Sequence, residues 1–172
     1  KVIGMVLAGG LSSRMGSDKA LLPYHGQTLL QHQAALLAIA GLKVVVSGDY
    51  EGFDCIPDRV VRCGPLGGIY SVALQYPDSA LVVAAVDMLQ ITPANVSRLR
   101  QNAVACHFAG QPLPAFFPDA GEVAIAIAAI LADPNRGFSL HRLHSLLSSE
   151  AISDAEFEPM NVNTVADWLA VE

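Results

Sequence analysis

Long apolar runs are missing from this chain, although its mean hydropathy of +0.42 is high and 52% of its residues are hydrophobic. The longest runs, such as residues 80–86, have the length of a strand. They fall far short of the roughly 20 residues that a membrane-spanning helix needs. Charged residues make up 15% of the chain, and this composition argues against disorder. We therefore expect a folded, soluble chain with no membrane partner.

Clusters of lysine and arginine are also absent. The formal net charge is −6, and nucleic acid is not an expected partner because its recognition needs a basic patch. Cysteine is scarce, since Cys55, Cys63 and Cys106 form no C-x-x-C pair, and such a sparse, odd number suits a reducing compartment. No signal peptide is visible, although Lys1 in first position indicates that an initiator methionine, or more, has been lost. We expect a cytoplasmic protein.

Short apolar segments alternate with segments of helical periodicity. Strands are predicted at residues 2–7, 42–46, 55–58, 80–86, 104–108 and 113–117, and helices at residues 27–40, 67–75, 93–99, 122–131, 139–148 and 164–170. This alternation is typical of crossover units and a mainly parallel sheet. The chain has 172 residues, no internal repeat and no evident linker. The prediction is a single three-layer α/β domain over residues 1–172.

The first predicted strand leads into the segment LAGGLSSRMGSDKALL, which holds little that can pack and much that can hold an anion. Gly9 and Gly10 allow backbone N–H groups to approach a phosphate closely, and Arg14 and Lys19 bring two positive charges. The spacing matches neither the P-loop nor G-x-G-x-x-G. Two interpretations stay open, an anion-binding loop or an ordinary glycine turn with two solvated cations.

Asp87 directly follows the apolar segment 80–86. Ligands of open α/β sheets bind outside the carboxyl ends of the strands. Mg²⁺ often takes only one or two protein carboxylates and completes its coordination with water and substrate phosphates. Asp87 is therefore a candidate Mg²⁺ ligand beside a nucleotide. The alternative is a helix cap, or an ion pair with Arg14 or Lys19.

Two further segments carry polar groups in suggestive positions. The turn GPLGG at residues 64–68 opens a predicted helix, so its N–H groups and the helix dipole are able to face a ligand. Asp58, just upstream, is either an acceptor for a sugar hydroxyl or base amine, or an ordinary turn residue. Asn161 and Asn163 alternate about a valine, so both amides project to one side of an extended segment. They either hydrogen-bond a polar heterocycle or belong to a capped turn.

Taken together and in this order, these segments resemble the MobA-like nucleotidyltransferases over nearly the whole chain. The matching residues are 7–10, 12–16, 18–19, 64–68, 87–88 and 161–164. The first motif is fairly specific for nucleotidyltransferases of this kind, and the N-V-N-T element singles out the guanylyltransferase branch. The resemblance implies a Rossmann-like fold that transfers GMP from Mg²⁺-bound GTP to molybdopterin and releases pyrophosphate.

The resemblance also implies roles for single residues. Those at nucleotide-binding positions are Leu7, Ala8, Gly9, Gly10, Lys19, Ser47, Asp58 and Asp87, of which Asp87 is also the Mg²⁺ ligand. Those at acceptor-binding positions are Asn161 and Asn163. The catalytic residues, which offset charge on the reacting phosphates, are Arg14, Lys19 and Asp87. Besides GTP and molybdopterin, the expected partners are proteins that transiently deliver or receive the cofactor.

The chain departs from the family pattern in three places. Leu89 and Val165 stand where proline is common. Around Gly110, where the family often has a histidine or arginine before the second proline, this chain reads QPLP at residues 111–114. These departures concern the acceptor side and motivate one alternative to a guanylyltransferase, a catalytically silent adaptor that binds a nucleotide or cofactor. A second alternative is a related transferase that uses CTP or a sugar phosphate.

Overall fold

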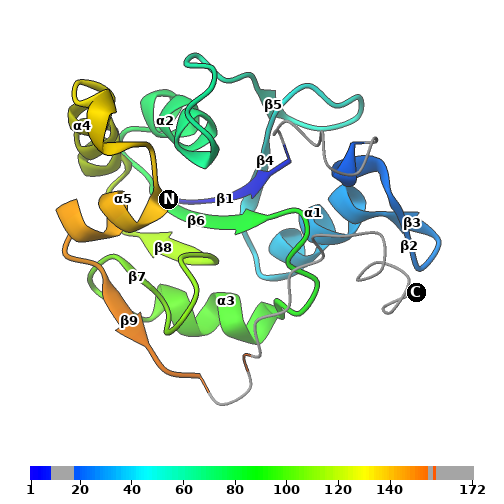
Figure 1. The fold of residues 1–172 in the computed structure, drawn as a ribbon. Helices are drawn as coiled ribbons and strands as arrows, with labels where there is room; N and C mark the ends of the chain where they lie inside the picture. Colours follow the sequence, from blue (N-terminus) through cyan, green and yellow to red (C-terminus); the bar gives the residue numbers. More distant parts are fainter. Residues whose placement is uncertain (9–17, 155–156, 158–172) are drawn as a thin grey trace.

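A seven-stranded sheet forms the centre of the computed structural model, which describes residues 1–8, 18–154 and 157 (Figure 1). Its strands, in chain order, are β1 (Val2–Leu7), β4 (Lys43–Ser47), β5 (Cys55–Ile56), β6 (Ala80–Ala85), β7 (Cys106–Phe108), β8 (Ala115–Phe117) and β9 (Glu150–Ile152). Their spatial order is β5-β4-β1-β6-β8-β7-β9. Only β8 among them pairs antiparallel with its neighbours. The predicted mainly parallel sheet is therefore confirmed.

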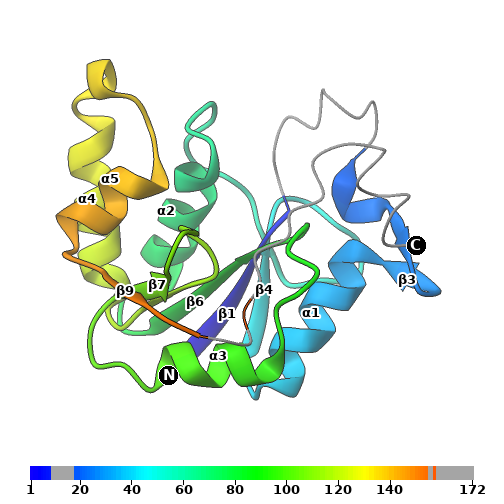
Figure 2. The same ribbon diagram turned by 60° about the horizontal axis from the view of Figure 1, so that its bottom comes forward.

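Helices cover both faces of the sheet, as Figure 2 shows. On one face lie α1 (Leu29–Ile39) and α3 (Pro93–Arg100), and on the other lie α2 (Pro65–Gln75) and α4 (Ala120–Leu131), with α5 (Leu140–Leu146) beside α4. The smaller elements are the hairpin of β2 (Pro23–Tyr24) and β3 (Gln27–Thr28) and the 3-10 turns η1 (Lys19–Leu21) and η2 (Pro134–Arg136). Within the described residues, no helix is long and apolar enough to cross a membrane. The three-layer prediction is confirmed.

The central strands are apolar along their length because helices cover them on both sides. Ile3 and Met5 of β1 and Val82 and Val83 of β6 are fully buried. The described helices begin within two residues of their predicted starts, and α3 begins at the predicted Pro93. Thr92 caps α3, with a reciprocal hydrogen bond between the cap residue and the third residue of the helix. The helix caps and the burial of the apolar strands therefore favour the same fold.

The strand order reverses at β1, which pairs with β4 on one side and β6 on the other. The connection through α1 covers one face, and the connection through α2 covers the opposite face. In open α/β sheets, such a switch point leaves a crevice at the carboxyl ends of the strands. Leu7 is level with both Ser47 and Ala85 at these ends. The topology therefore marks this edge as the place for a site.

Element boundaries differ from the predicted ones by one or two residues at most ends, and the differences have local causes. α2 starts at Pro65, because proline is accepted in the first helical turn. The hairpin of β2 and β3 was not predicted; its turn places His25 and Gly26 at positive φ, a pattern that suits tight hairpins. β9 was missed because its three residues carry only one apolar β-branched side chain. The predicted helix 164–170 lies outside the described residues.

Two histidines hold the connection between β7 and β8. His107 Nδ1 donates to the carbonyl oxygen of Gln111 over 2.7 Å, and His144 Nε2 donates to that of Pro112 over 2.8 Å. The two rings lie 4.3 Å apart between centroids. Because β7 runs parallel to β6, this connection lies at the same sheet edge as the ends of β1 and β6. His144 is buried, and burial, aided by His107 and His141, lowers its pKa to about 4 against the opposing effect of the Pro112 bond.

The first prediction concerns stability against pH. Burial lowers the pKa of His144 from its ordinary 6.5 to about 4 in the folded chain, so the unfolded chain takes up a proton first as the pH falls. The free energy of unfolding is expected to fall by about 3 kcal/mol as the pH drops from about 6.5 to about 4. Burial and His25 also lower the pKa of His32, which adds to the same trend. Urea unfolding followed over this pH range measures the fall.

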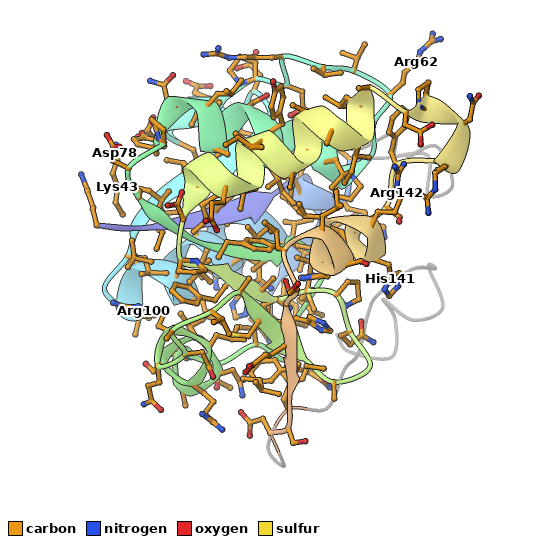
Figure 3. The ribbon with its side chains drawn as sticks, turned by 90° about the vertical axis from the view of Figure 1, so that its left-hand side faces the viewer. Lys43, Arg62, Asp78, Arg100, His141 and Arg142 are labelled. Carbon is orange, nitrogen blue, oxygen red and sulfur yellow. The ribbon has the colours of Figure 1, made fainter. Side chains whose placement is uncertain are left out.

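His144→Gln isolates the contribution of this ring, because glutamine keeps an Nε2 donor for Pro112 and does not titrate. This variant is expected to show a flatter pH dependence, by up to about one proton in the slope. His141→Gln is the control for losing a histidine from the same helix, since the His141 side chain is exposed at the surface (Figure 3). His141 makes the smallest contribution to the lowered pKa of His144, so this variant should change the slope far less. An unchanged slope in His144→Gln would contradict the assignment.

Candidate active site

An ion pair joins two of the predicted site residues at the switch point. Lys19 begins η1 and Asp87 lies two residues beyond β6, and their Nζ and Oδ2 atoms are 3.0 Å apart. Their side chains are 22% and 18% exposed, so the pair is shielded from bulk water and still within reach of a ligand. The ion-pair alternative for Asp87, with Lys19 as partner, is thus present in the structure. A carboxylate and a cation therefore lie together at the carboxyl-end edge of the sheet, where ligands of open α/β sheets bind.

A buried side-chain amide, that of Gln33, stabilises the turn that carries Asp87. Met88 N donates to the carbonyl oxygen of Ala85 over 3.2 Å, which closes the turn. Gln33, fully buried on α1, donates from Nε2 to the carbonyl oxygen of Met88. The sequence did carry a signal for this residue, because Gln33 is a polar residue at a stripe position between Leu30 and Leu37. It was not predicted as a site residue.

A second pair lies at the end of β4. Ser47 is buried and donates from Oγ to Oδ1 of the exposed Asp58 over 3.0 Å. Gly68 of α2 lies directly against this pair, because a Cβ atom there would collide with Ser47 Oγ. A Cβ atom on Gly67 would collide with the carbonyl oxygen of Val60. The two glycines therefore let α2 pack against the Ser47–Asp58 pair.

The Ser71 hydroxyl links the segment after Asp58 to α2. Ser71 Oγ accepts from Arg59 N over 2.8 Å and donates to the carbonyl oxygen of Gly67 over 2.9 Å. The first residue of α2 follows Gly64, whose φ is +56°, and no side chain caps this end of the helix. Because α2 connects two parallel strands, its N-terminus lies at the same edge as Lys19 and Asp87. Its positive dipole end therefore faces the candidate site.

The remaining predicted residues fall into two groups. Leu7 is the last residue of β1 and Ala8 follows it. Their exposed fractions are only 8% and 6%, so they offer a ligand backbone groups more than side chains. The other group lies outside the described residues and consists of Gly9, Gly10, Arg14, Asn161 and Asn163. Sequence reasoning missed Gln33, Ser71 and Tyr50, of which Tyr50 sits in a polar loop that gives no periodic signal.

A magnesium ion is implied by the resemblance, and the donor set at Asp87 can be tested against it. In the described part of the chain, no group of three or more His, Cys, Asp or Glu side chains is arranged to hold a metal. A single carboxylate is enough for Mg²⁺ when substrate phosphates and water complete its octahedron. Asp87 is partly buried and already faces the positive charge of Lys19. The residue therefore fits a nucleotide-bound Mg²⁺ and does not by itself form a cage for a free ion.

Comparison with solved structures first establishes the class of fold. The molybdopterin-guanine dinucleotide biosynthesis protein A of Archaeoglobus fulgidus aligns over 99% of this chain and 96% of its own, with a TM-score of 0.77 and 19% identity. The 2-C-methyl-D-erythritol 4-phosphate cytidylyltransferase of Thermus thermophilus aligns over 97% of this chain and 95% of its own, with a TM-score of 0.68 and 14% identity. The fold is the Rossmann-like fold of nucleotidyltransferases.

Sequence comparison then gives the family. Residues 4–150 match the model of the MobA-like NTP transferase domain. A molybdenum cofactor guanylyltransferase of Xanthomonas euvesicatoria pv. vesicatoria is 41% identical, over 96% of this chain and 91% of that protein. The chain belongs to the MobA-like NTP transferase family and is a nucleotidyltransferase.

The second prediction tests the packing at Gly68. A glycine-to-alanine change inside a helix normally stabilises a protein, by up to about 1 kcal/mol. In Gly68→Ala the added methyl group would meet Ser47 Oγ, so we expect a loss of about 1–3 kcal/mol in the free energy of unfolding. Urea unfolding measures it. Ser47→Ala in the same background removes the colliding oxygen and should restore part of the loss, whereas equal or greater stability of Gly68→Ala would contradict the geometry.

Proposed function

We propose that this chain transfers GMP from Mg²⁺-bound GTP to molybdopterin, forming the guanine dinucleotide cofactor and releasing pyrophosphate. The observation that carries the proposal is the Lys19–Asp87 pair, a cation and a carboxylate 3.0 Å apart at the edge where ligands of such sheets bind. The name of the 41% identical relative, molybdenum cofactor guanylyltransferase, supports the choice of nucleotide and acceptor.

The proposed reaction is a displacement at phosphorus. A phosphate oxygen of the acceptor forms a bond to the α-phosphorus of GTP, and the bond from that phosphorus to the bridging oxygen of pyrophosphate breaks. The attacking oxygen is anionic at neutral pH, so no general base is required. The protein must instead align two groups that repel each other and offset the charge that leaves on pyrophosphate.

The Lys19 ammonium group offers three N–H donors, and in this proposal it moves from Asp87 to the phosphate oxygens of the bound nucleotide. Asp87 would then hold the metal, which when bound supplies charge compensation for the triphosphate. The Ser47–Asp58 pair would accept from a ribose hydroxyl or a base amine, with Leu7 and Ala8 offering backbone groups. We further propose that Gly9, Gly10 and Arg14 bind the phosphates of the nucleotide. Asn161 and Asn163 are proposed to bind the acceptor.

The third prediction tests the proposed function itself. The protein is incubated with Mg²⁺, molybdopterin and GTP labelled at the α-phosphate, and the labelled dinucleotide and pyrophosphate are measured, with CTP in a parallel reaction. Wild-type protein should form the product with GTP and not with CTP. Asp87→Asn should lower kcat/KM by about 100-fold or more, because a neutral amide neither binds Mg²⁺ well nor pairs with Lys19.

Asp54→Asn is the matched control, because Asp54 pairs with Lys43 over 3.2 Å on the surface. In Figure 3, Lys43 lies at the opposite end of the molecule from Arg62 and His141. This variant should keep wild-type kcat/KM. Full activity of Asp87→Asn would refute the assignment of that residue, and absence of product from wild-type protein with active acceptor would refute the guanylyltransferase proposal. Product from CTP instead would favour the cytidylyl alternative.

The fourth prediction concerns the exchange of partners at Asp87. In the free protein, a divalent cation has to displace Lys19 from the carboxylate. Lys19→Met removes that competitor, so the affinity of nucleotide-free protein for Mn²⁺, used as a probe for Mg²⁺, should rise by about three- to tenfold. The affinity for GTP should fall at the same time, because the variant lacks the ammonium group.

Mn²⁺ binding is measured by calorimetry or by electron paramagnetic resonance, so the result does not depend on catalysis. Lys43→Met is the control, since it breaks an exposed ion pair with Asp54 and should leave Mn²⁺ binding unchanged. Unchanged or weaker Mn²⁺ binding in Lys19→Met would show that Asp87 does not hold the metal.

A further inference from the structure

The hydroxyl of Tyr50 lies between two parts of the chain that the glycine-rich segment separates. Tyr50 belongs to the connection from β4 to β5. Its hydroxyl oxygen is 3.1 Å from the carbonyl oxygen of Ala8 and 2.9 Å from Asp18 Oδ2. Both neighbours are acceptors, so the single hydroxyl proton is shared between them.

The two acceptors are placed at opposite ends of residues 9–17. Ala8 directly follows β1, and Asp18 directly precedes Lys19. Asp18 is also the N-cap of η1, where its other oxygen, Oδ1, accepts from Ala20 N over 3.0 Å. One carboxylate therefore links the Tyr50 hydroxyl to the backbone turn that carries Lys19.

Tyr50 itself is held in place by its surroundings. Its backbone N donates to Cys55 Sγ over 3.2 Å, and Cys55 Sγ donates to its carbonyl oxygen over 3.3 Å. Its ring lies against Gly48, where φ is +133° and a Cβ atom would be 2.6 Å from the ring atom Cε2. Burial and Asp18 raise the pKa of Tyr50, so the hydroxyl keeps its proton at neutral pH. The group is a fixed donor.

We propose that Tyr50 is a positioning residue for the nucleotide, whose hydroxyl ties Asp18 to the end of β1 and thereby sets where Lys19 stands. The inference rests on the proposed function, since it assigns Lys19 to the phosphates. In its present position on η1, Lys19 reaches Asp87, with Nζ and Oδ2 3.0 Å apart. Without the tie, the lysine would have to be ordered when the nucleotide binds, at a cost in affinity.

The fifth prediction follows from this role. Tyr50→Phe keeps the ring against Gly48 and removes only the hydroxyl. It should raise the KM for GTP, and the Kd for GTP measured by calorimetry, by about five- to tenfold. The KM for molybdopterin should stay unchanged. Tyr76→Phe is the matched control, because it removes a hydroxyl that accepts from Lys43 over 2.9 Å, at the far end of β4. It should leave both KM values as in wild-type protein.

A double variant separates positioning from general stability. If Tyr50 acts through Lys19, Tyr50→Phe should weaken GTP binding no further in a Lys19→Met background. A purely structural role would instead add its full effect there, or lower the melting temperature while leaving the Kd for GTP unchanged at low temperature. Either outcome, or wild-type KM in Tyr50→Phe, would overturn the inference. Inactive wild-type protein would refute the proposed function, and the calorimetric comparison of GTP binding would still test Tyr50.

Discussion

The double pairing of β1 is the constraint on which the site depends. β1 is hydrogen-bonded along its length to β4 and to β6, so the ends of three strands are fixed relative to one another. This register sets Leu7 level with Ser47 and Ala85, and it leaves Asp87 just above the sheet edge. A slip of one residue would turn every side chain of a strand to the other face. The apolar residues of β1 and β6 exclude such a slip, because it would disturb a core covered on both faces. The position of the candidate site is therefore a consequence of core packing.

Lys19 compensates the negative charge of the partly buried Asp87 carboxylate at that edge of the sheet. A partly buried carboxylate is costly to leave unpaired, and the free protein meets this cost with its own cation. The pair is neither fully exposed nor fully buried, and its strength lies between that of a surface pair and that of a buried one. A ligand that brings both a metal and phosphates would offer each partner a replacement of the same sign of charge. The ion pair thus compensates both charges in the free protein, and the proposed function requires that both contacts be exchanged when the nucleotide binds.

Local sequence patterns predicted most of the fold because an apolar strand or a helix cap depends on residues that are close together in the sequence. The strand-end rule then pointed to Asp87 as a site candidate, and the structure shows the ion pair with Lys19 that the sequence had left open as the alternative. Residues that act between distant segments could not be found in this way. Gln33 and Met88 are 55 positions apart, and Tyr50 and Ala8 are 42 apart. Their contacts exist only once the sheet has brought α1 and the β4–β5 connection to the same edge, and no spacing in the chain encodes this.

The GPLGG turn shows how one motif serves two purposes. Its glycines were expected to let backbone approach a ligand, but Gly67 and Gly68 bring the backbone of α2 close to the protein itself, at Val60 and at the Ser47–Asp58 pair. This close packing draws the uncapped N-terminus of α2 toward the ends of β1 and β4. The positive end of the helix dipole and the polar pair then lie at the same edge of the sheet. This arrangement depends on the absence of side chains at these two positions, because a methyl group on either would collide with Val60 or Ser47 and push the helix away from the strands.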